Sequence, residues 1–476
     1  MTIREAASGL PRVLGLRDVV LLYAIAIVGP QWLSTAAQAG APSLALWILA
    51  LVAFFVPCGF AVMEMNSRYA GEGGLYVWVK QAFGDLHGFV CGWSYVVSNL
   101  VFFPTLLLFM TAAAAYGIGA PGLKDDFAFN AALSVFVIWF VVVANIFGLS
   151  RAKWIANAGA LVMAVVLGVL AVAALVLVRR FGSATGFAGA LLPDLSDGAL
   201  VKAFATMMFG LVGYELAPLM GAEIREPRRV IPRAIVLSGL MIVAFYVGGT
   251  WALLAALPRE QIDALSGVPD AIGTIAGRLG APALGPVASL LIAIASIGGL
   301  AAWVTGGVRM PYVVGVDRYL PVALGRLNPR WQTPVVALVV VGALTTVLVL
   351  VALAGATVGE AYQALVDMTI VLTFVPLVYL FAALPMLRAK RIGEREAVLR
   401  IPGGTAGIAL VTALGVGSTL LSIVFALAPP EHGSVPMFYA KVISGCVLFL
   451  GLGLVFYCLQ PNAHDTPAQR DVIDEG

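Results

Sequence analysis

The chain has 476 residues, of which 61% are hydrophobic and 11% are charged. A soluble globular protein is about 45–50% apolar and about 25% charged, so this chain has too few charges to cover a soluble surface. Its net charge of +3 is also too small to indicate nucleic acid as a partner. Composition therefore predicts an integral membrane protein and excludes a string of soluble domains.

Twelve apolar runs are long enough to cross a bilayer, because a membrane-spanning helix needs about 20 mostly apolar residues. The runs are continuous and rich in Leu, Ala and Val, which favours helices over the alternating strands of a β-barrel. We therefore expect an all-α membrane fold of about twelve spans. The runs cover residues 18–42, 44–66, 87–119, 130–149, 152–178, 200–222, 233–257, 284–308, 334–355, 362–387, 404–427 and 435–459.

The first span contains Gly29 and Pro30 near its middle. Proline removes one backbone N–H and clashes with the carbonyl four residues back, and glycine accommodates the distorted backbone that results. The sequence therefore predicts that the helix is interrupted at residues 28–32. Packing notches and simple kinks are the alternative reading, since Gly and Pro are common in membrane helices.

The sixth span carries a second set of interrupting residues, Gly210, Gly213 and Pro218, around the acid Glu215. The two interrupted spans are the first and the sixth, five apart in the order of spans, so they run in opposite directions, as in an inverted repeat. Paired interruptions at matching positions of two halves are the best sequence pointer to a transport site. We expect an N-terminal segment at 1–17, repeat one at 18–178, repeat two at 200–387, two further spans at 404–459 and a tail at 460–476.

The distribution of Lys and Arg predicts the orientation. Basic residues concentrate in cytoplasmic connections, and with a cytoplasmic N-terminus 21 of the 28 fall inside. An odd number of spans would destroy this alternation. We therefore expect both termini in the cytoplasm and a multi-pass protein of the inner, or plasma, membrane of the cell.

Three stretches resemble a known family. They are residues 55–65 with Gly71-Glu-Gly-Gly-Leu-Tyr-Val-Trp78, the run Phe209-Gly-Leu-Val-Gly-Tyr-Glu215, and residues 222–234. In order and spacing the chain resembles the amino acid–polyamine–organocation superfamily of secondary transporters, and the second-span stretch resembles its bacterial glutamate/GABA antiporter branch. The resemblance implies a five-plus-five inverted repeat with discontinuous helices 1 and 6, two extra C-terminal helices, and alternating access.

The first-span break departs from the pattern of this family. Many amino-acid members have a Gly-Ser-Gly-type run there, whose bare amides hold the substrate carboxylate. Here the run is Val28-Gly-Pro-Gln-Trp32, and Pro30 has no amide hydrogen. The side-chain amide of Gln31 could replace the lost donor.

Candidate site residues follow from the two breaks and from the acids inside spans. Ionisable groups in the membrane are costly and usually mark function, and the resemblance links an acid at the position of Glu215 to proton coupling. Glu64 has a gating or a packing role beside Arg68, and Asp367, at the start of the tenth span, lines the cavity or caps a helix turn. Trp303 and Tyr312 are weaker candidates. The predicted substrate-binding residues are Val28, Gly29, Gln31, Trp32, Phe209, Gly210, Gly213 and Tyr214, and the predicted coupling or gating residues are Glu215, Glu64 and Asp367.

The sequence therefore predicts a secondary transporter for an amino acid or a closely related small amine, acting as an exchanger or as a proton symporter. A polyamine or other organic cation, bound by Glu215, Asp367 and Trp32, is the alternative. We expect no enzymatic activity, cofactor or metal. The three histidines are scattered along the chain and do not indicate a metal site, and the sequence contains no P-loop or hydrolase motif. Membrane lipid is an expected partner, and small residues on many helix faces permit an oligomer without requiring one.

Overall fold

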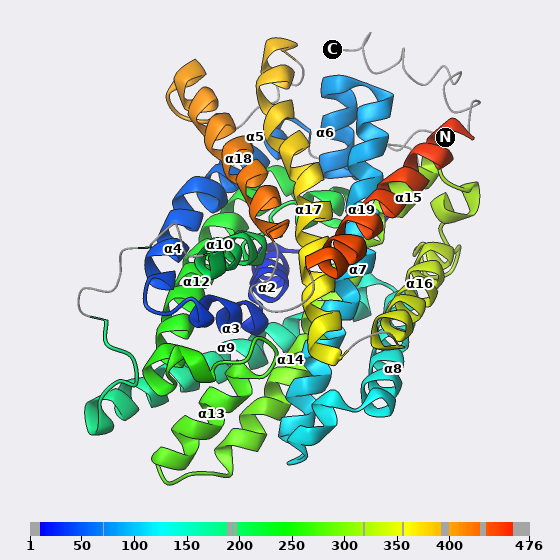
Figure 1. Cartoon of the computed structure of the whole chain (residues 1–476). Helices are drawn as coiled ribbons and strands as arrows, with labels where there is room; N and C mark the ends of the chain where they lie inside the picture. The colour runs from blue at the N-terminus through cyan, green and yellow to red at the C-terminus, as the bar shows by residue number, and fades with distance from the viewer. Residues whose placement is uncertain are drawn as a thin grey trace.

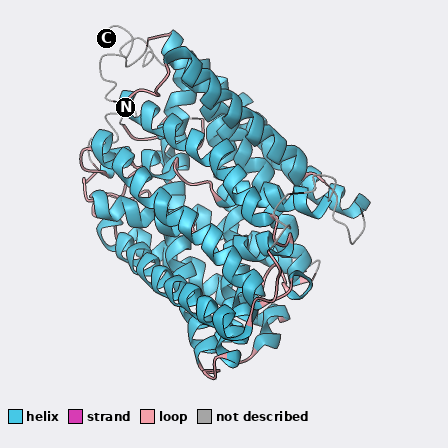
Figure 2. Ribbon diagram, turned by 90° about the vertical axis from the view of Figure 1, so that its left-hand side faces the viewer, coloured by secondary structure: helices cyan, strands magenta, loops and turns pink. Residues whose placement is uncertain are grey.

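The computed structural model describes residues 10–69, 71–187, 193, 198–317, 319–354, 357–391, 399–428 and 435–459. Over this part of the chain the structure is built from helices and connecting loops without a named strand (Figures 1 and 2). The predicted all-α membrane fold is confirmed. The expected tail at 460–476 and the first nine residues lie outside the described residues.

Eleven helices of the described chain are long and apolar enough to cross a membrane. The sixth expected span differs, because it is divided into α10 (Gly198–Gly210) and α11 (Leu216–Leu219), each too short alone. The others are α2 and α3 (Leu16–Ile27, Pro30–Gln38), α4 to α5 (Ser43–Ala50, Val56–Arg68), α7 (Asp85–Gly117), α8 (Phe127–Ile146), α9 (Leu149–Phe181), α12 (Pro227–Ala256), α14 and α15 (Leu284–Gly307, Arg309–Val316), α16 (Val335–Ala354), α17 (Val358–Ala389), α18 (Gly404–Ala426) and α19 (Val435–Cys458).

The second span contains a local irregularity. A π-helical turn, η1 (Leu51–Phe55), separates α4 from α5 just before Pro57. A proline in a helix interior lacks an N–H and displaces the carbonyl four residues back, and the wider π turn accommodates that displacement. The span therefore continues through the proline without breaking.

Two helices outside the expected spans mark the two ends of the molecule. α6 (Gly74–Phe83) follows the second span, and α13 (Gly267–Arg278) follows the seventh, in a stretch that we expected as a connection. Figure 1 shows α6 at the top of the molecule and α13 at the bottom. Corresponding helices at opposite ends are what an inverted repeat requires. We call the end with α6 the N-terminal face.

The eighth span lies in the centre of the helix packing. α14 packs along α7 and α9, and its contact with α9 depends on two glycines, Gly159 and Gly298. A Cβ atom on Gly298 would lie 2.7 Å from the Cα of Gly159 and 3.0 Å from the carbonyl oxygen of Ile155. Small residues permit such close approach of membrane helices.

We predict that Gly298→Ala destabilises the protein by about 1–3 kcal/mol, the usual cost of overpacking, because both neighbours of the new methyl group are backbone atoms. Thermal unfolding in detergent measures the loss. The matched control is Gly168→Ala on α9, where an added Cβ meets no atom within 4 Å. Equal unfolding temperatures for the two variants would contradict the prediction.

Candidate functional site

The first-span helix is interrupted where the sequence predicts it. α2 ends at Ile27 and α3 begins at Pro30, and both intervening residues are extended, Val28 at φ −71°, ψ 101° and Gly29 at φ −115°, ψ 111°. Proline occupies the first turn of α3, where a missing N–H costs nothing. The chain therefore leaves regular helix inside the span and resumes it immediately.

The sixth span is interrupted over a longer stretch, between Gly210 and Leu216. Gly213 adopts φ 145°, and a Cβ there would lie 2.6 Å from a side-chain carbon of Ile27. Only glycine fits this conformation and this contact. The two interruptions therefore touch each other.

The two interrupted spans run antiparallel. Leu14, before the first break, is hydrogen-bonded to the backbone of the segment after the second break. The Leu14 N–H donates to the Glu223 carbonyl at 3.1 Å, and the Leu14 carbonyl accepts from the Arg225 N–H at 2.9 Å. Beyond the first break, α3 packs on α10, which precedes the second break. Each half of one span thus faces the opposite half of the other.

A tyrosine of the seventh span joins both breaks. The Tyr246 hydroxyl on α12 accepts a hydrogen bond from the Gly29 N–H at 3.2 Å, and its oxygen lies 2.5 Å from the Ile27 carbonyl oxygen and 2.7 Å from that of Gly210. A hydroxyl has one proton, so it can donate to only one of these carbonyls at a time. The other carbonyl is available to a different donor.

Four aromatic rings lie around the breaks. The Trp32 indole is 5.2 Å from the Phe209 ring and 6.3 Å from the Phe102 ring, and Phe102 is 5.3 Å from Trp303. The Trp303 indole N–H donates to the Ala26 carbonyl at 2.8 Å. Of the two weaker sequence candidates, Trp303 therefore contacts the first break, whereas Tyr312 lies near Glu72.

All eleven predicted site residues are buried, but their side chains have different surroundings. Gln31 is 1% exposed, and its amide nitrogen has no hydrogen-bond partner among the described residues. Tyr214 instead packs its ring on Phe55 and donates its hydroxyl to the Ile235 carbonyl at 3.0 Å. Gln31 thus offers a free donor at the break, and the Tyr214 hydroxyl is occupied.

Glu215 lies at the end of the second break and is fully buried. Its carboxylate accepts the Gly213 N–H at 3.1 Å and the Tyr95 hydroxyl of α7 at 3.4 Å. The acid therefore ties the interrupted backbone to the third span.

Asp367 is deeper than the sequence suggests. We expected it at the start of the tenth span, but α17 begins at Val358, and the Asp367 side chain is 1% exposed. One carboxylate oxygen lies 3.0 Å from the Lys202 ammonium on α10, and the other accepts from Gln363 at 3.2 Å. This ion pair joins the first half of the sixth span to the tenth.

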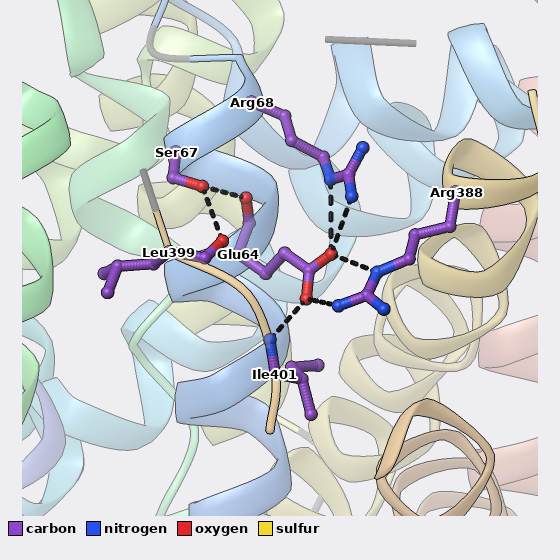
Figure 3. Close-up of polar contacts among 6 residues, drawn as sticks. All are labelled: Glu64, Ser67, Arg68, Arg388, Leu399 and Ile401. Atoms are coloured by element: carbon purple, nitrogen blue, oxygen red, sulfur yellow. Dashed lines mark hydrogen bonds and ion pairs between the residues drawn. The ribbon is translucent and has the colours of Figure 1, made fainter. Parts of the chain in front are cut away.

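Glu64 lies in a separate cluster on the N-terminal face (Figure 3). Its carboxylate accepts two hydrogen bonds from the Arg68 guanidinium, at 3.0 Å and 3.2 Å, and two from the Arg388 guanidinium on α17, both at 2.6 Å. It also accepts a hydrogen bond from the Ile401 N–H at 2.8 Å. Breaking such a buried pair costs about 3–5 kcal/mol. Glu64 therefore anchors the second span to the tenth span and to the segment before α18.

Two further ionic contacts lie beside the first and sixth spans on the N-terminal face. Arg309 on α15 binds Glu223 with two hydrogen bonds of 2.8 Å and 2.7 Å. Lys153 on α9 lies 3.0 Å from Asp18 and donates to the Val13 carbonyl at 2.9 Å. Lys153 therefore pairs with the start of the first span.

Some residues at the site carry no signal in the sequence. Tyr246, Phe102 and Lys202 lie in ordinary apolar helices, and their partners are remote along the chain: Tyr246 is 219 residues from Ile27. Tertiary packing alone brings them to the breaks. A polar residue in the middle of an apolar span is the one hint that Tyr246 offers.

The chain is similar in sequence to known membrane transporters. The family model of amino acid permeases matches residues 14–452. An uncharacterized transporter of Legionella pneumophila is 26% identical over 94% of this chain and 96% of its own length. An uncharacterized transporter of Mycobacterium tuberculosis is 30% identical over 72% of this chain and 75% of its own length.

Two further relatives carry names that state their solutes. The serine/threonine exchanger SteT of Bacillus subtilis is 23% identical over 82% of this chain and 86% of its own length. The probable agmatine/putrescine antiporter AguD of Lactococcus lactis is 27% identical over 57% of this chain and 59% of its own length. From the family match and the two interrupted spans, we conclude that this chain belongs to the amino acid permease family of membrane transporters.

Proposed function

We propose that the chain carries an amino acid or a closely related small amine across the cell membrane by alternating access, as an exchanger or a proton-coupled symporter. The observation that carries the proposal is the contact between two interrupted helices inside the protein. Unpaired backbone groups cost several kcal/mol each in a bilayer. They persist where protein, water or a solute satisfies them, and a solute between the breaks does so.

The solute carboxylate binds at the start of α3. Among the first-break donors, the Gly29 N–H is taken by Tyr246, Pro30 has none, and the Trp32 N–H donates to the Gly29 carbonyl at 3.1 Å. Gln31 remains, with an unpartnered and buried side-chain amide. The positive end of the helix dipole adds to the attraction for an anion.

The solute amine binds at a backbone carbonyl of the breaks. The Tyr246 hydroxyl can donate to the Ile27 carbonyl or to the Gly210 carbonyl but not to both. An ammonium N–H of the solute donates to the carbonyl that Tyr246 leaves free. The rings of Trp32, Phe102 and Phe209 form an apolar wall beside it. A small α-amino acid matches this combination of one free amide, one free carbonyl and aromatic surface.

A polyamine or other organic cation is the alternative, supported by the similarity to the agmatine/putrescine antiporter. A cation without a carboxylate needs a free acid. Asp367 already faces Lys202 at 3.0 Å, and Glu215 accepts two hydrogen bonds from the protein. The geometry therefore favours the amino acid.

Ionic contacts on either side of the breaks serve as the two gates. Along the sixth span, Lys202 with Asp367 precedes the break, and Glu223 with Arg309 follows it. Both contacts are formed in this structure. Alternating access requires one contact to open while the other stays closed.

The placement in the cell completes the proposal. The distribution of Lys and Arg supports an N-terminal face in the cytoplasm of the cell, with both chain termini on that side of the cell membrane. Repeat one at 18–178 and repeat two at 200–387 move relative to each other about the breaks. Lipid surrounds the exposed apolar faces of the outer helices, and protons act through Glu215.

We predict that Gln31→Leu weakens the uptake of amino acids about 10- to 150-fold in apparent affinity, because a hydrogen bond to a charged group is worth about 1.5–3 kcal/mol. The corresponding amines, which lack the carboxylate, are unaffected. The measurement is counterflow in proteoliposomes with a panel of labelled amino acids and amines, with and without a pH gradient. Gln261→Leu, an exposed site, is the control. Wild-type affinity for amino acids in Gln31→Leu would exclude the carboxylate site, and exclusive uptake of amines by the wild type would favour the alternative.

We predict that Glu215→Gln abolishes accumulation driven by a pH gradient while leaving exchange at equal pH within a few-fold of wild type. The amide keeps the hydrogen-bond acceptor for the Gly213 N–H but cannot bind and release a proton. The readout is solute accumulation in proteoliposomes with an imposed pH gradient. Unchanged gradient-driven accumulation would show that the proton is carried elsewhere.

A further inference from the structure

A second buried acid lies outside the breaks, in the connection between α5 and α6. Glu72 belongs to the Gly71-Glu-Gly-Gly run and is 4% exposed. It shares the interior of the N-terminal face with Glu223, 1% exposed, and Arg309, 3% exposed. Neither the predicted site nor the proposed gates account for Glu72.

Arg309 gives no hydrogen bond to Glu72. Its guanidinium is engaged with Glu223 at 2.8 Å and 2.7 Å and with the Thr305 carbonyl at 3.2 Å. One Glu72 oxygen accepts the Ala222 N–H at 3.1 Å, and the other is buried with no partner among the described residues. One oxygen of the Glu72 carboxyl group is therefore buried without a hydrogen bond among the described residues.

The charges of the cluster do not balance if every group is ionised. Two carboxyl groups face a single guanidinium, so an ionised Glu72 would be an uncompensated buried charge, which is strongly unfavourable. Burial, and next the charge of Glu223, raise the pKa of Glu72 well above its ordinary value, against the opposing effect of Arg309. The charged and titratable groups that face Glu72 are Glu223 on η3 (Gly221–Glu223), and Arg309 and Tyr312 on α15.

The backbone around Glu72 seals the N-terminal face against the sixth span. Residues 72 and 220 form an isolated bridge, and the Gly73 N–H donates to the Leu219 carbonyl at 3.3 Å. A Cβ on Gly74, at φ 35°, would lie 2.8 Å from the Pro218 backbone. Movement of α11 away from this connection therefore separates Glu72 from the Ala222 N–H and admits water to its carboxyl group.

We propose that Glu72 is a proton-binding site that controls the opening of the N-terminal face: the protonated acid keeps the face closed, and loss of the proton to water accompanies its opening. The proton leaves the carboxyl oxygen when the face opens and returns when the face closes. The inference rests on the proposed transport cycle, because a gate has a purpose only in a carrier.

The sign of the pH dependence follows from the closed state binding the proton more tightly than the open state. The proton on Glu72 stabilises the closed state relative to the open state in full at pH values below the ordinary pKa of a glutamate. This stabilisation is lost as the pH rises toward the raised pKa that Glu72 has in the closed state. In that window a higher pH on the N-terminal face promotes opening, by at most about tenfold per pH unit for a single proton.

The first test is equilibrium exchange in proteoliposomes at equal pH on both sides, which removes any gradient effect. Glu72→Gln keeps the shape and the acceptor for the Ala222 N–H but cannot ionise. We expect the wild-type exchange rate to rise with pH and the Glu72→Gln rate to stay at the wild-type acid level throughout. Glu226→Gln, an exposed acid on the same face, should follow the wild-type profile. A Glu72→Gln profile that rises like wild type would overturn the proposal.

A second test does not depend on transport. In detergent, the thermal stability of the wild type should fall as pH rises through the window, and that of Glu72→Gln should fall less, with equal stability at acid pH. A parallel fall in both proteins, or a loss of stability in Glu72→Gln at acid pH, would contradict the proposal. If no solute is found for the wild type, the proposed transport function fails, whereas the unfolding comparison still decides the protonation of Glu72.

Discussion

The backbone hydrogen bonds that two spans give up inside the membrane constrain the rest of the structure. Helix is the default in a bilayer because it satisfies every N–H and C=O internally, and here the chain abandons it at residues 28–29 and 211–215. Side chains of neighbouring spans and of the sixth span itself supply replacements. Tyr246 contacts both breaks, Trp303 donates to the first, and Glu215 accepts from the second. They leave the Gln31 amide and one carbonyl without a partner, and these are the groups at which we propose that the solute binds.

The ionic contacts of the protein are arranged along the same two spans. Lys202 and Asp367 lie before the sixth-span break, and Glu223 and Arg309 lie after it. Buried ion pairs contribute little to net stability, because desolvation offsets their attraction, but breaking one by removing a partner is costly. Such contacts suit gates, which must be specific when closed and still able to open when water replaces the partner. Glu64, held by two arginines and a backbone amide, is saturated and suits an anchor instead.

The sequence predicts the helices and both breaks because the signals are local: apolar runs of span length, Gly29 before Pro30, and glycines beside Glu215. It places Gln31 and Trp32 at the site for the same reason. It misses Tyr246, because the residue that Tyr246 contacts, Ile27, lies 219 residues away along the chain. It also misses Lys202 and treats Asp367 as interfacial, because these two residues pair with each other from different spans. It also misses α13, since this helix of 12 residues lacks the long apolar run that marks a span. The repeat boundaries and the roles of individual site residues stay predictions.

Hydrogen–deuterium exchange of the detergent-purified protein tests the central claim most directly, with and without the amino acid that counterflow identifies. If the solute completes the hydrogen bonding of the interrupted backbone, exchange at residues 28–32 and 208–216 should slow on binding, at both breaks together and more than in the unbroken α16. Saturating solute that leaves exchange unchanged at both breaks, while transport proceeds, would contradict the account.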